Sequence, residues 1–218
     1  RSSDLVSNGG VHGHIQHVVA AARAMTEQGL RVVIHAVTDG RDVPPQSAQG
    51  FVTELQGALV DGASVGTVIG RYFAMDRDNR WDRVGRAYHA MIRGEGLPAD
   101  SADIAVVNAY ARGETDEFIQ PTVIAGYDGA RDGDGFFCLN FRADRAREIM
   151  AAVAQPDFAD FPVEGRPRWS GVLGMVDYSA RHDTFMQAAY PKKQVENTLA
   201  HWVASKGLRQ FHIAETEI

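Results

Sequence analysis

The sequence is poor in cysteine, in lysine and in long apolar runs. A single cysteine, Cys138, cannot form a disulfide within the chain, and its position in the run FFCLNF favours a small buried side chain. No apolar run approaches the roughly 18 residues that a membrane-spanning helix needs. The opening stretch RSSDLVSNGG lacks the basic-then-apolar pattern of a secretory signal. We therefore expect a soluble cytoplasmic protein without a membrane partner.

Acidic residues outnumber basic ones, with 28 Asp and Glu against 22 Lys and Arg and a net charge of −6. Non-specific binding to nucleic acid needs a basic surface that displaces counterions from phosphate, so we expect no nucleic-acid partner. A local basic cluster must then have a smaller anionic target. Arginine is the favoured cation of the whole chain, because its only lysines are Lys192, Lys193 and Lys206.

Short β-branched or aromatic runs alternate with longer amphipathic stretches along the chain. This pattern predicts an α/β fold with three layers, in which helices cover both faces of a mostly parallel sheet. With 218 residues, 44% of them hydrophobic, the chain can bury a full core, and we expect residues 1–218 to form a single domain. Two segments, 109–133 and 155–168, show no clear period, and the second is expected to be a surface connection. The expected strands span 5–7, 31–37, 65–70, 135–141, 171–176 and 209–214, and the expected helices span 15–29, 47–59, 82–93, 143–154 and 195–206.

Four of the expected strands run directly into polar clusters: LVS into NGGVHGH, VVIHAV into TDGRDVPP, TVIG into RYFAMDRDNR, and FFCLNF into RADRAR. In open parallel sheets the ligand binds beyond the carboxyl ends of the strands, where the strand-to-helix loops meet. The planar fork of an arginine binds carboxylate or phosphate through two parallel hydrogen bonds. The pattern therefore predicts an anion site at this edge, formed by five arginines: Arg41, Arg71, Arg77, Arg142 and Arg145.

The stretch GRYFAMDRDNRWDR, residues 70–83, has two interpretations. On a solvated helix face, opposite charges three or four residues apart would support one another. Such faces are usually built from Glu and Lys, however, and this stretch contains neither. In an anion clamp, Arg71 and Arg77 would reach the ligand, whereas Arg80 and Arg83 would lie further away on the following helix. The position directly after a strand favours the clamp.

The cluster NGGVHGH places histidines beside a tight turn that leads into a helix, whose free amide groups favour an anion. It fits neither the phosphate-binding loop of nucleotide hydrolases nor the dinucleotide fingerprint. His12, His14 and His17 resemble a metal cluster, but no acidic or Cys ligand accompanies them. We interpret His12, at the loop edge, as a single functional histidine and expect no metal site in this chain. His35, within a strand pattern, is expected to be a hydrogen-bonded core residue.

In TDGRDVPP, Arg41 and Asp42 are adjacent in a loop that glycine and proline shape. An internal carboxylate contact that holds the turn would explain the pair without any ligand. Alternatively, Arg41 binds the ligand and Asp42 transfers a proton or binds a hydroxyl group. In RADRAR, Arg142 and Arg145 are three residues apart, so both can point from the first helical turn to one ligand, and Asp144 could orient them. Four aromatic residues are expected to be packing residues: Tyr88, Trp169, Tyr190 and Trp202.

Six motifs occur in the order and spacing of one known family: GGVHGH, DGRDVPP, GRYFAMDRDNRW, TDEFIQP, NFRADRAR and IAETE. The chain resembles the cofactor-independent (2,3-bisphosphoglycerate-independent) phosphoglycerate mutases from Leu5 to Glu217. The resemblance implies a parent protein in which an alkaline-phosphatase-like domain carries two Mn²⁺ ions and a nucleophilic serine, and an inserted α/β domain binds phosphoglycerate. The chain resembles the inserted domain alone, without its companion. Its start at Arg1 rather than Met is typical of an excised or processed piece.

The resemblance also implies a reaction: interconversion of 3-phosphoglycerate and 2-phosphoglycerate in glycolysis and gluconeogenesis, through a phosphoserine formed on the companion domain. Asp42 matches the aspartate that shuttles protons at the glycerate hydroxyls. No cofactor is implied for this chain, and the chain alone is expected to be inactive. In Asn8 and Gly13 it departs from the usual Asp and Ser, and the family continues beyond ETE with a substrate-binding lysine. The implied substrate contacts are His12, Arg41, Asp42, Arg71, Arg77, Arg142 and Arg145.

Two other hypotheses compete with this one. The chain could be a free-standing module that binds a phospho-ligand or a carboxylate and performs no chemistry. It could also be an insert of a related phosphatase-superfamily enzyme that takes another sugar phosphate. The motifs DGRDVPP and NFRADR favour the mutase, because they match a catalytic family and no pattern of a binding protein.

Overall fold

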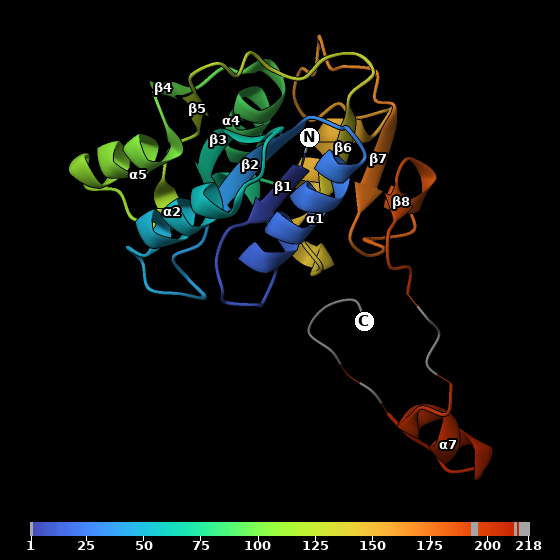
Figure 1. The fold of residues 1–218 in the computed structure, drawn as a ribbon. Coiled ribbons are helices and arrows are strands. Elements are labelled where there is room, and N and C mark those ends of the chain that lie inside the picture. Colours follow the sequence, from blue (N-terminus) through green and yellow to red (C-terminus); the bar gives the residue numbers. More distant parts are fainter. Residues whose placement is uncertain (1, 193–195, 212, 214–218) are drawn as a thin grey trace.

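The computed structural model describes residues 2–192, 196–211 and 213. Within them, eight strands form one sheet in the order β4-β5-β3-β2-β1-β6-β7-β8 (Figure 1). Neighbouring strands pair in parallel, except that β5 runs antiparallel to β3. The strands are β1 Ser2–Leu5, β2 Val32–Thr38, β3 Ala63–Gly70, β4 Leu97–Ala99, β5 Thr122–Ile124, β6 Gly135–Cys138, β7 Gly171–Gly174 and β8 Gln187–Ala188.

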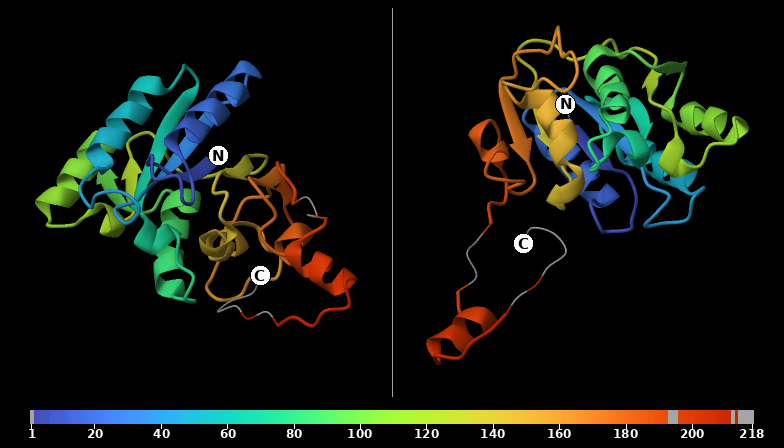
Figure 2. Two further views of the ribbon diagram at one scale, coloured as in Figure 1. Left: turned by 90° about the horizontal axis from the view of Figure 1, so that it is seen from below. Right: turned by 180° about the vertical axis from the view of Figure 1, so that it is seen from behind.

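Helices cover both faces of the sheet, so the predicted three-layer α/β fold is confirmed (Figure 2). Helices α1, α2 and α5 pack on one face, and α4 and α6 pack on the other. A short helix, α3, directly follows β3, and α7 has no buried residue. The helices are α1 Ile15–Glu27, α2 Ala48–Ala58, α3 Arg71–Ala74, α4 Trp81–Tyr88, α5 Ala102–Ala111, α6 Arg147–Ala154 and α7 Leu199–Ser205.

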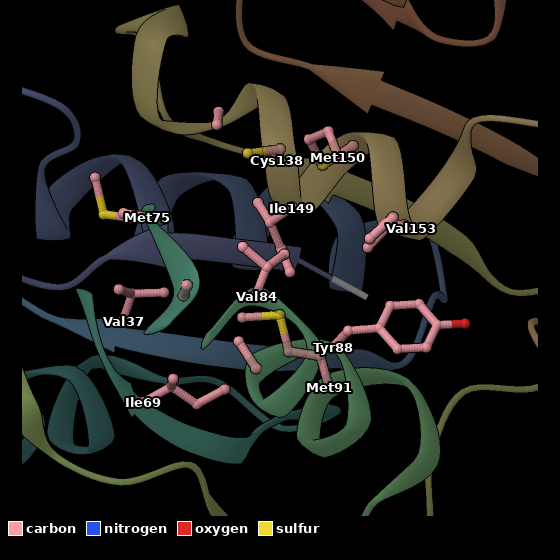
Figure 3. Close-up of a cluster of buried hydrophobic side chains, with 14 of the residues drawn as sticks. Val37, Ile69, Met75, Val84, Tyr88, Met91, Cys138, Ile149, Met150 and Val153 are labelled. Carbon is pink, nitrogen blue, oxygen red and sulfur yellow. The ribbon is translucent and has the colours of Figure 1, made fainter. Parts of the chain in front are cut away.

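The sheet separates two apolar layers because successive residues of a strand point to opposite faces. In β2, Ala36 packs in the cluster of α1 and α2, whereas Val37 packs in the cluster of α4 and α6. Figure 3 shows the second cluster, where Ile69 from β3 faces the same layer as Val84 from α4 and Ile149 from α6. This double core fixes the strand ends that carry the polar loops.

Most of the expected elements are present, with ends that differ by a few residues. The strands expected at 31–37, 65–70, 135–141 and 171–176 correspond to β2, β3, β6 and β7. The strand expected at 5–7 corresponds to β1, which starts three residues earlier and ends two residues earlier. Residues His89–Arg93 continue α4 as a π-helical turn, and Ala143–Arg145 form a 3-10 turn before α6. Residue 195, the expected start of the last helix, lies outside the described residues.

The prediction of a strand at 209–214 is wrong for those of its residues that the structure describes. Residues 209–211 and 213 belong to no strand, and residues 212 and 214 are not among those described. Phe211 and Ile213 are each 85% exposed, so no neighbouring element covers this apolar pattern. Helix α5 was not predicted, because its exposed face also carries apolar residues, Ile104 and Val107, and no helical stripe stands out. Strands β4, β5 and β8 are too short to show a period.

Several single-residue predictions can be compared with the structure. Tyr88, His35 and Cys138 are buried as expected, and His35 shares a hydrogen bond with the Thr67 hydroxyl at 3.0 Å. Tyr190 and Trp202 are exposed, so their prediction as packing residues is wrong. Trp169 does pack, and its ring nitrogen donates to the carbonyl of Val153. The segment 155–168, expected to be a surface connection, contributes one buried side chain, Phe158, to the core. Among the described residues, no helix has the length and apolar character to cross a membrane.

Candidate functional site

The loops that follow four strands meet at one edge of the sheet. Strands β3, β2, β1 and β6 are neighbours in that order and run parallel, so their carboxyl ends lie side by side. Each predicted site residue follows one of these ends: His12 after β1, Arg41 and Asp42 after β2, Arg71 and Arg77 after β3, and Arg142 and Arg145 after β6. The structure thus brings all seven residues to the same edge.

Arg71 is the buried centre of this edge. It is the first residue of α3, directly after β3, and its side chain is 3% exposed. Its Nη1 atom lies 2.6 Å from Asp39 Oδ1 and 2.7 Å from Asp42 Oδ2. A guanidinium group removed from water needs such carboxylate partners. The interpretation of residues 70–83 as one solvated helix face is therefore wrong, because Arg71 is the buried centre of two ion pairs.

Asp39 holds the loop that carries Arg41 and Asp42. Its Oδ1 atom accepts hydrogen bonds from the backbone N–H groups of Arg41 at 3.2 Å and Asp42 at 3.1 Å, and its Oδ2 atom accepts from the Ser7 hydroxyl at 2.7 Å. Burial raises the pKa of Asp39, but the hydrogen bonds from Ser7, the Asp42 amide and Arg71 outweigh it, so this pKa is lower than usual. The turn is thus held by an internal carboxylate, which is Asp39 and not Asp42.

Asp144 connects three of the predicted residues on the other side of the edge. Its Oδ1 atom lies 3.0 Å from Arg142 Nε and 4.0 Å from His12 Nδ1, and its Oδ2 atom accepts a hydrogen bond from Arg77 Nη1 at 3.1 Å. Asp144 therefore orients Arg142, as expected, but its second partner is Arg77 and not Arg145.

Arg145 is the least neutralised arginine of the group. It donates to the backbone carbonyl of Met75 at 3.0 Å instead of to a carboxylate. Burial lowers the pKa of Arg145, and the positive charges of Arg77, Arg71 and Arg41 lower it further. Arg41 is half-exposed, and its Nη1 atom lies 3.5 Å from Glu117 Oε1. Crowded positive charge of this kind is relieved when an anion binds.

His12 is buried at the same edge, and its Nδ1 atom has no hydrogen-bond partner among the described residues. Burial lowers the pKa of His12 to about 4, and Arg71 and Arg142 act in the same direction against Asp144 and Asp42. The imidazole is therefore neutral at pH 7 and can offer one N–H donor to a ligand.

We expect NMR titration of the chain to find His12 neutral down to about pH 5, with a midpoint near 4. The same histidine in the urea-unfolded chain, as the control, should titrate near its ordinary pKa of about 6.5. Because the unfolded state then binds the proton more readily, the contribution of His12 to stability is complete above about pH 6.5 and is lost as the pH falls towards 4. A midpoint above 6 in the folded chain would contradict this environment.

The segment TDEFIQP, residues 115–121, presses against the carboxyl ends of β2 and β3. Asp116 is fully buried, and its Oδ2 atom accepts from the backbone N–H groups of Ser47 at 2.8 Å and Ala48 at 2.9 Å, at the start of α2. A Cβ atom at Gly70 would meet the backbone nitrogen of Ile119 at 2.7 Å, so only glycine fits there. This packing sets Glu117 beside Arg41.

Sequence reasoning missed three acidic residues of this edge: Asp39, Asp116 and Glu117. Asp39 carried a usable signal, because it directly follows a buried strand and precedes Gly40, where loop carboxylates often accept backbone N–H groups. Nothing local marks Asp116, whose partners at the start of α2 are far away in the sequence.

Within the described part of the chain, no three or more His, Cys, Asp or Glu side chains form a group that could hold a metal ion. His14 instead caps α1, where its Nδ1 atom accepts from the N–H group of Gln16 at 3.2 Å. The ring of His17 lies edge-on to Phe141, with centroids 5.8 Å apart.

The parallel sheet and its arginine-rich edge define an α/β protein of the kind whose strand ends receive an anionic ligand. The family model described as "BPG-independent PGAM N-terminus (iPGM_N)" matches residues 3–180. The chain belongs to this family, the BPG-independent phosphoglycerate mutases.

Individual relatives agree with this assignment. The chain is 72% identical over 213 residues to the 2,3-bisphosphoglycerate-independent phosphoglycerate mutase of Paracoccus denitrificans, and 60% identical to that of Roseobacter denitrificans. In both cases the match covers 98% of this chain and 42% of the relative. A crystal structure of Leishmania mexicana phosphoglycerate mutase is similar in fold, with a TM-score of 0.84 at 26% identity over 94% of this chain and 40% of that chain. The chain thus spans less than half the length of these relatives.

Proposed function

We propose that residues 1–218 form the single substrate-binding domain of a cofactor-independent phosphoglycerate mutase, which interconverts 3-phosphoglycerate and 2-phosphoglycerate. A companion domain, outside this chain, would supply the nucleophilic serine and two Mn²⁺ ions. Family membership supports this assignment. The relatives are more than twice as long as the part that matches this chain, which leaves room for a second domain in the whole protein. The absence of a metal-binding group among the described residues is compatible with metals on another domain.

The crowding of positive charge at the carboxyl edge carries the proposal. Phosphoglycerate has a carboxylate and a phosphate, and each suits the two-pronged geometry of arginine. Among the described residues, Arg145 lies beside other arginines without a carboxylate contact of its own, and Arg77 and Arg142 share the carboxylate of Asp144. The carboxylate and phosphate of an incoming phosphoglycerate would neutralise the positive charge of these three side chains.

Asp42 is the candidate for proton transfer at the glycerate hydroxyls. Its Oδ2 atom binds Arg71, which fixes the carboxylate, while about one fifth of the side chain stays exposed at the edge. A fixed, accessible carboxyl group can give a proton to the oxygen that loses the phosphoryl group and take one from the hydroxyl that receives it after the glycerate has turned. The neutral imidazole of His12 would help to hold the substrate by donating one hydrogen bond.

The isolated chain should have no mutase activity, because phosphoryl transfer needs a positioned nucleophile and stabilisation of the transferred group. The test compares the chain with the full-length protein in a coupled assay, each with and without manganese. Activity of the full-length protein alone supports the proposal. Turnover by highly purified chain would contradict it. If the full-length protein were inactive but the chain bound phosphoglycerate, the chain would be a binding module instead.

A further inference from the structure

The turn that carries Arg77 is built around one buried carboxylate. Residues 75–80 connect α3 with α4, and Asp76, only 4% exposed, lies at their centre. Its Oδ2 atom accepts from the backbone N–H groups of Asp78 at 3.0 Å and Arg80 at 2.9 Å. Its Oδ1 atom accepts from Arg83 Nη1 of α4 at 3.1 Å. These bonds fix the backbone that directly follows Arg77.

A second buried carboxylate holds the same turn from α6. Glu148 is 9% exposed, and its Oε1 atom accepts from the N–H group of Asn79 at 2.9 Å. Asn79 has a φ of 55°, a left-handed conformation that asparagine adopts more readily than most other residues. Glu148 thus holds the residue at which the turn changes its backbone conformation.

The two carboxylates lie side by side, because Asp76 accepts from the N–H groups of Asp78 and Arg80 and Glu148 accepts from that of Asn79 between them. The remaining oxygen of Glu148, Oε2, is buried and accepts from no donor group among the described residues. Two ionised carboxylates only accept hydrogen bonds, so a bond between them requires a proton on one of them. Two like charges so close in a site with little water would also repel each other strongly.

We propose that Glu148 and Asp76 share one proton and that this proton positions Arg77 at the substrate site. Protonated Glu148 donates to Asp76, which stays ionised for Arg83 and the two backbone groups. Glu148 is a positioning residue, because it acts on the substrate only through the turn. The inference rests on the proposed function in so far as Arg77 binds phosphoglycerate.

The surroundings of the pair favour this arrangement. Burial raises the pKa of Glu148 to about 7, and the charges of Asp76 and Asp78 contribute in the same direction against the Asn79 N–H group. Burial raises the pKa of Asp76 too, but the N–H groups of Arg80 and Asp78, the bond from Glu148 and the charge of Arg83 bring it below its usual value.

The other charged groups near α6 are engaged elsewhere. Arg145, in the turn before α6, donates to the Met75 carbonyl, and His182, in the turn packed on α6, contacts the carbonyl of Arg147. The proton therefore lies mainly on Glu148.

The first test measures the stability of the 218-residue chain by urea unfolding between pH 5 and 8. The raised pKa of Glu148 means that the folded chain binds a proton that the unfolded chain has released, so its stability falls as the pH rises from about 4.5 to about 7. Glu148→Gln keeps one acceptor for Asn79 and one donor for Asp76 and cannot ionise. The unfolding constant of the wild type, relative to this variant, should rise by up to about tenfold per pH unit in that window.

The comparison isolates Glu148, because the opposite contribution of His12 is common to both proteins. Glu27→Gln, on the exposed end of α1, is the matched control and should follow the wild type at every pH. Infrared spectra of the wild-type chain give an independent reading that needs no variant: a protonated carboxyl band should persist above pH 6, lose about half its intensity near pH 7 and vanish at higher pH. If the stabilities of wild type and Glu148→Gln changed with pH in the same way, or if no such infrared band were seen, the proposal of a shared proton would be overturned.

The second test measures kcat/KM of the full-length enzyme from pH 6 to 8.5. The ratio of Glu148→Gln to wild type cancels titrations common to both and should rise roughly threefold or more as Glu148 ionises in the wild type. If this kcat/KM ratio did not change with pH although the unfolding constants of the two proteins diverged, the positioning role of Glu148 would be overturned. Arg77→Ala without any loss of kcat/KM would instead contradict the proposed function, and the unfolding result would still stand.

Discussion

Arg71→Ala is expected to lower the free energy of unfolding by about 3 to 5 kcal/mol, the cost of removing one partner from a buried ion pair. The change leaves Asp39 and Asp42 with no guanidinium group between them, and Asp39 is itself 1% exposed. Asp39 also holds the backbone of its own loop, so its repulsion from Asp42 would disturb the whole strand end. Chemical unfolding of the chain measures the loss.

Arg80→Ala is the matched control for this experiment. Arg80 comes from the same stretch, but its Nε atom lies 3.6 Å from Asp82 and both side chains are more than half exposed. Exposed pairs of this kind contribute roughly 0 to 1 kcal/mol. Arg71→Lys should restore part of the lost stability, because an ammonium group keeps one positive charge beside the two carboxylates that share Arg71 Nη1. A loss below about 1 kcal/mol for Arg71→Ala would show that Arg71 is not the buried centre of the edge.

Arg77→Ala should have the opposite profile, with a large loss of activity and a small loss of stability. Arg77 is 49% exposed and, among the described residues, forms an ion pair with Asp144 alone, so its removal should change the melting temperature little. In the full-length enzyme it should cost about 2 to 5 kcal/mol of transition-state stabilisation, the range for one partner of a desolvated charge pair.

Catalytic efficiency and melting temperature of Arg77→Ala and Arg80→Ala, measured in parallel, test this prediction. Arg80→Ala should leave both quantities close to those of the wild type. If the two variants lost equal activity in proportion to their melting temperatures, Arg77 would have no special contact with the substrate.

The position of the site could be predicted from the sequence, because parallel strands that each end in a polar loop must bring those loops together. Burial could not be predicted from the same pattern. Arg71 and Arg77 look alike in GRYFAMDRDNRWDR, yet one is almost fully buried and the other half-exposed. The difference depends on Asp39 and Asp42, more than 25 residues earlier, and on Asp144 from another strand end.

Arg83 illustrates the same limit. The sequence predicts that Arg83, like Arg80, lies away from the ligand on the helix after the turn, and Arg83 does lie on α4. Its side chain is only 19% exposed, however, and binds the buried Asp76. It also stacks on Tyr72, with 3.9 Å between its guanidinium carbon and the ring centre. Such partners come from tertiary packing. The expected strand at 209–214 failed for a related reason, because an apolar alternation specifies a strand only where a neighbouring strand can pair with it.

The most direct test of the account is a crystal structure of the full-length enzyme with 3-phosphoglycerate bound. We predict that the carboxylate and phosphate groups contact Arg77, Arg142 and Arg145 at the carboxyl edge, with Asp42 beside the glycerate hydroxyls. A ligand bound elsewhere would contradict the account, above all one in the hollow at the opposite end of the strands, which Val33, Gly66 and Tyr127 line.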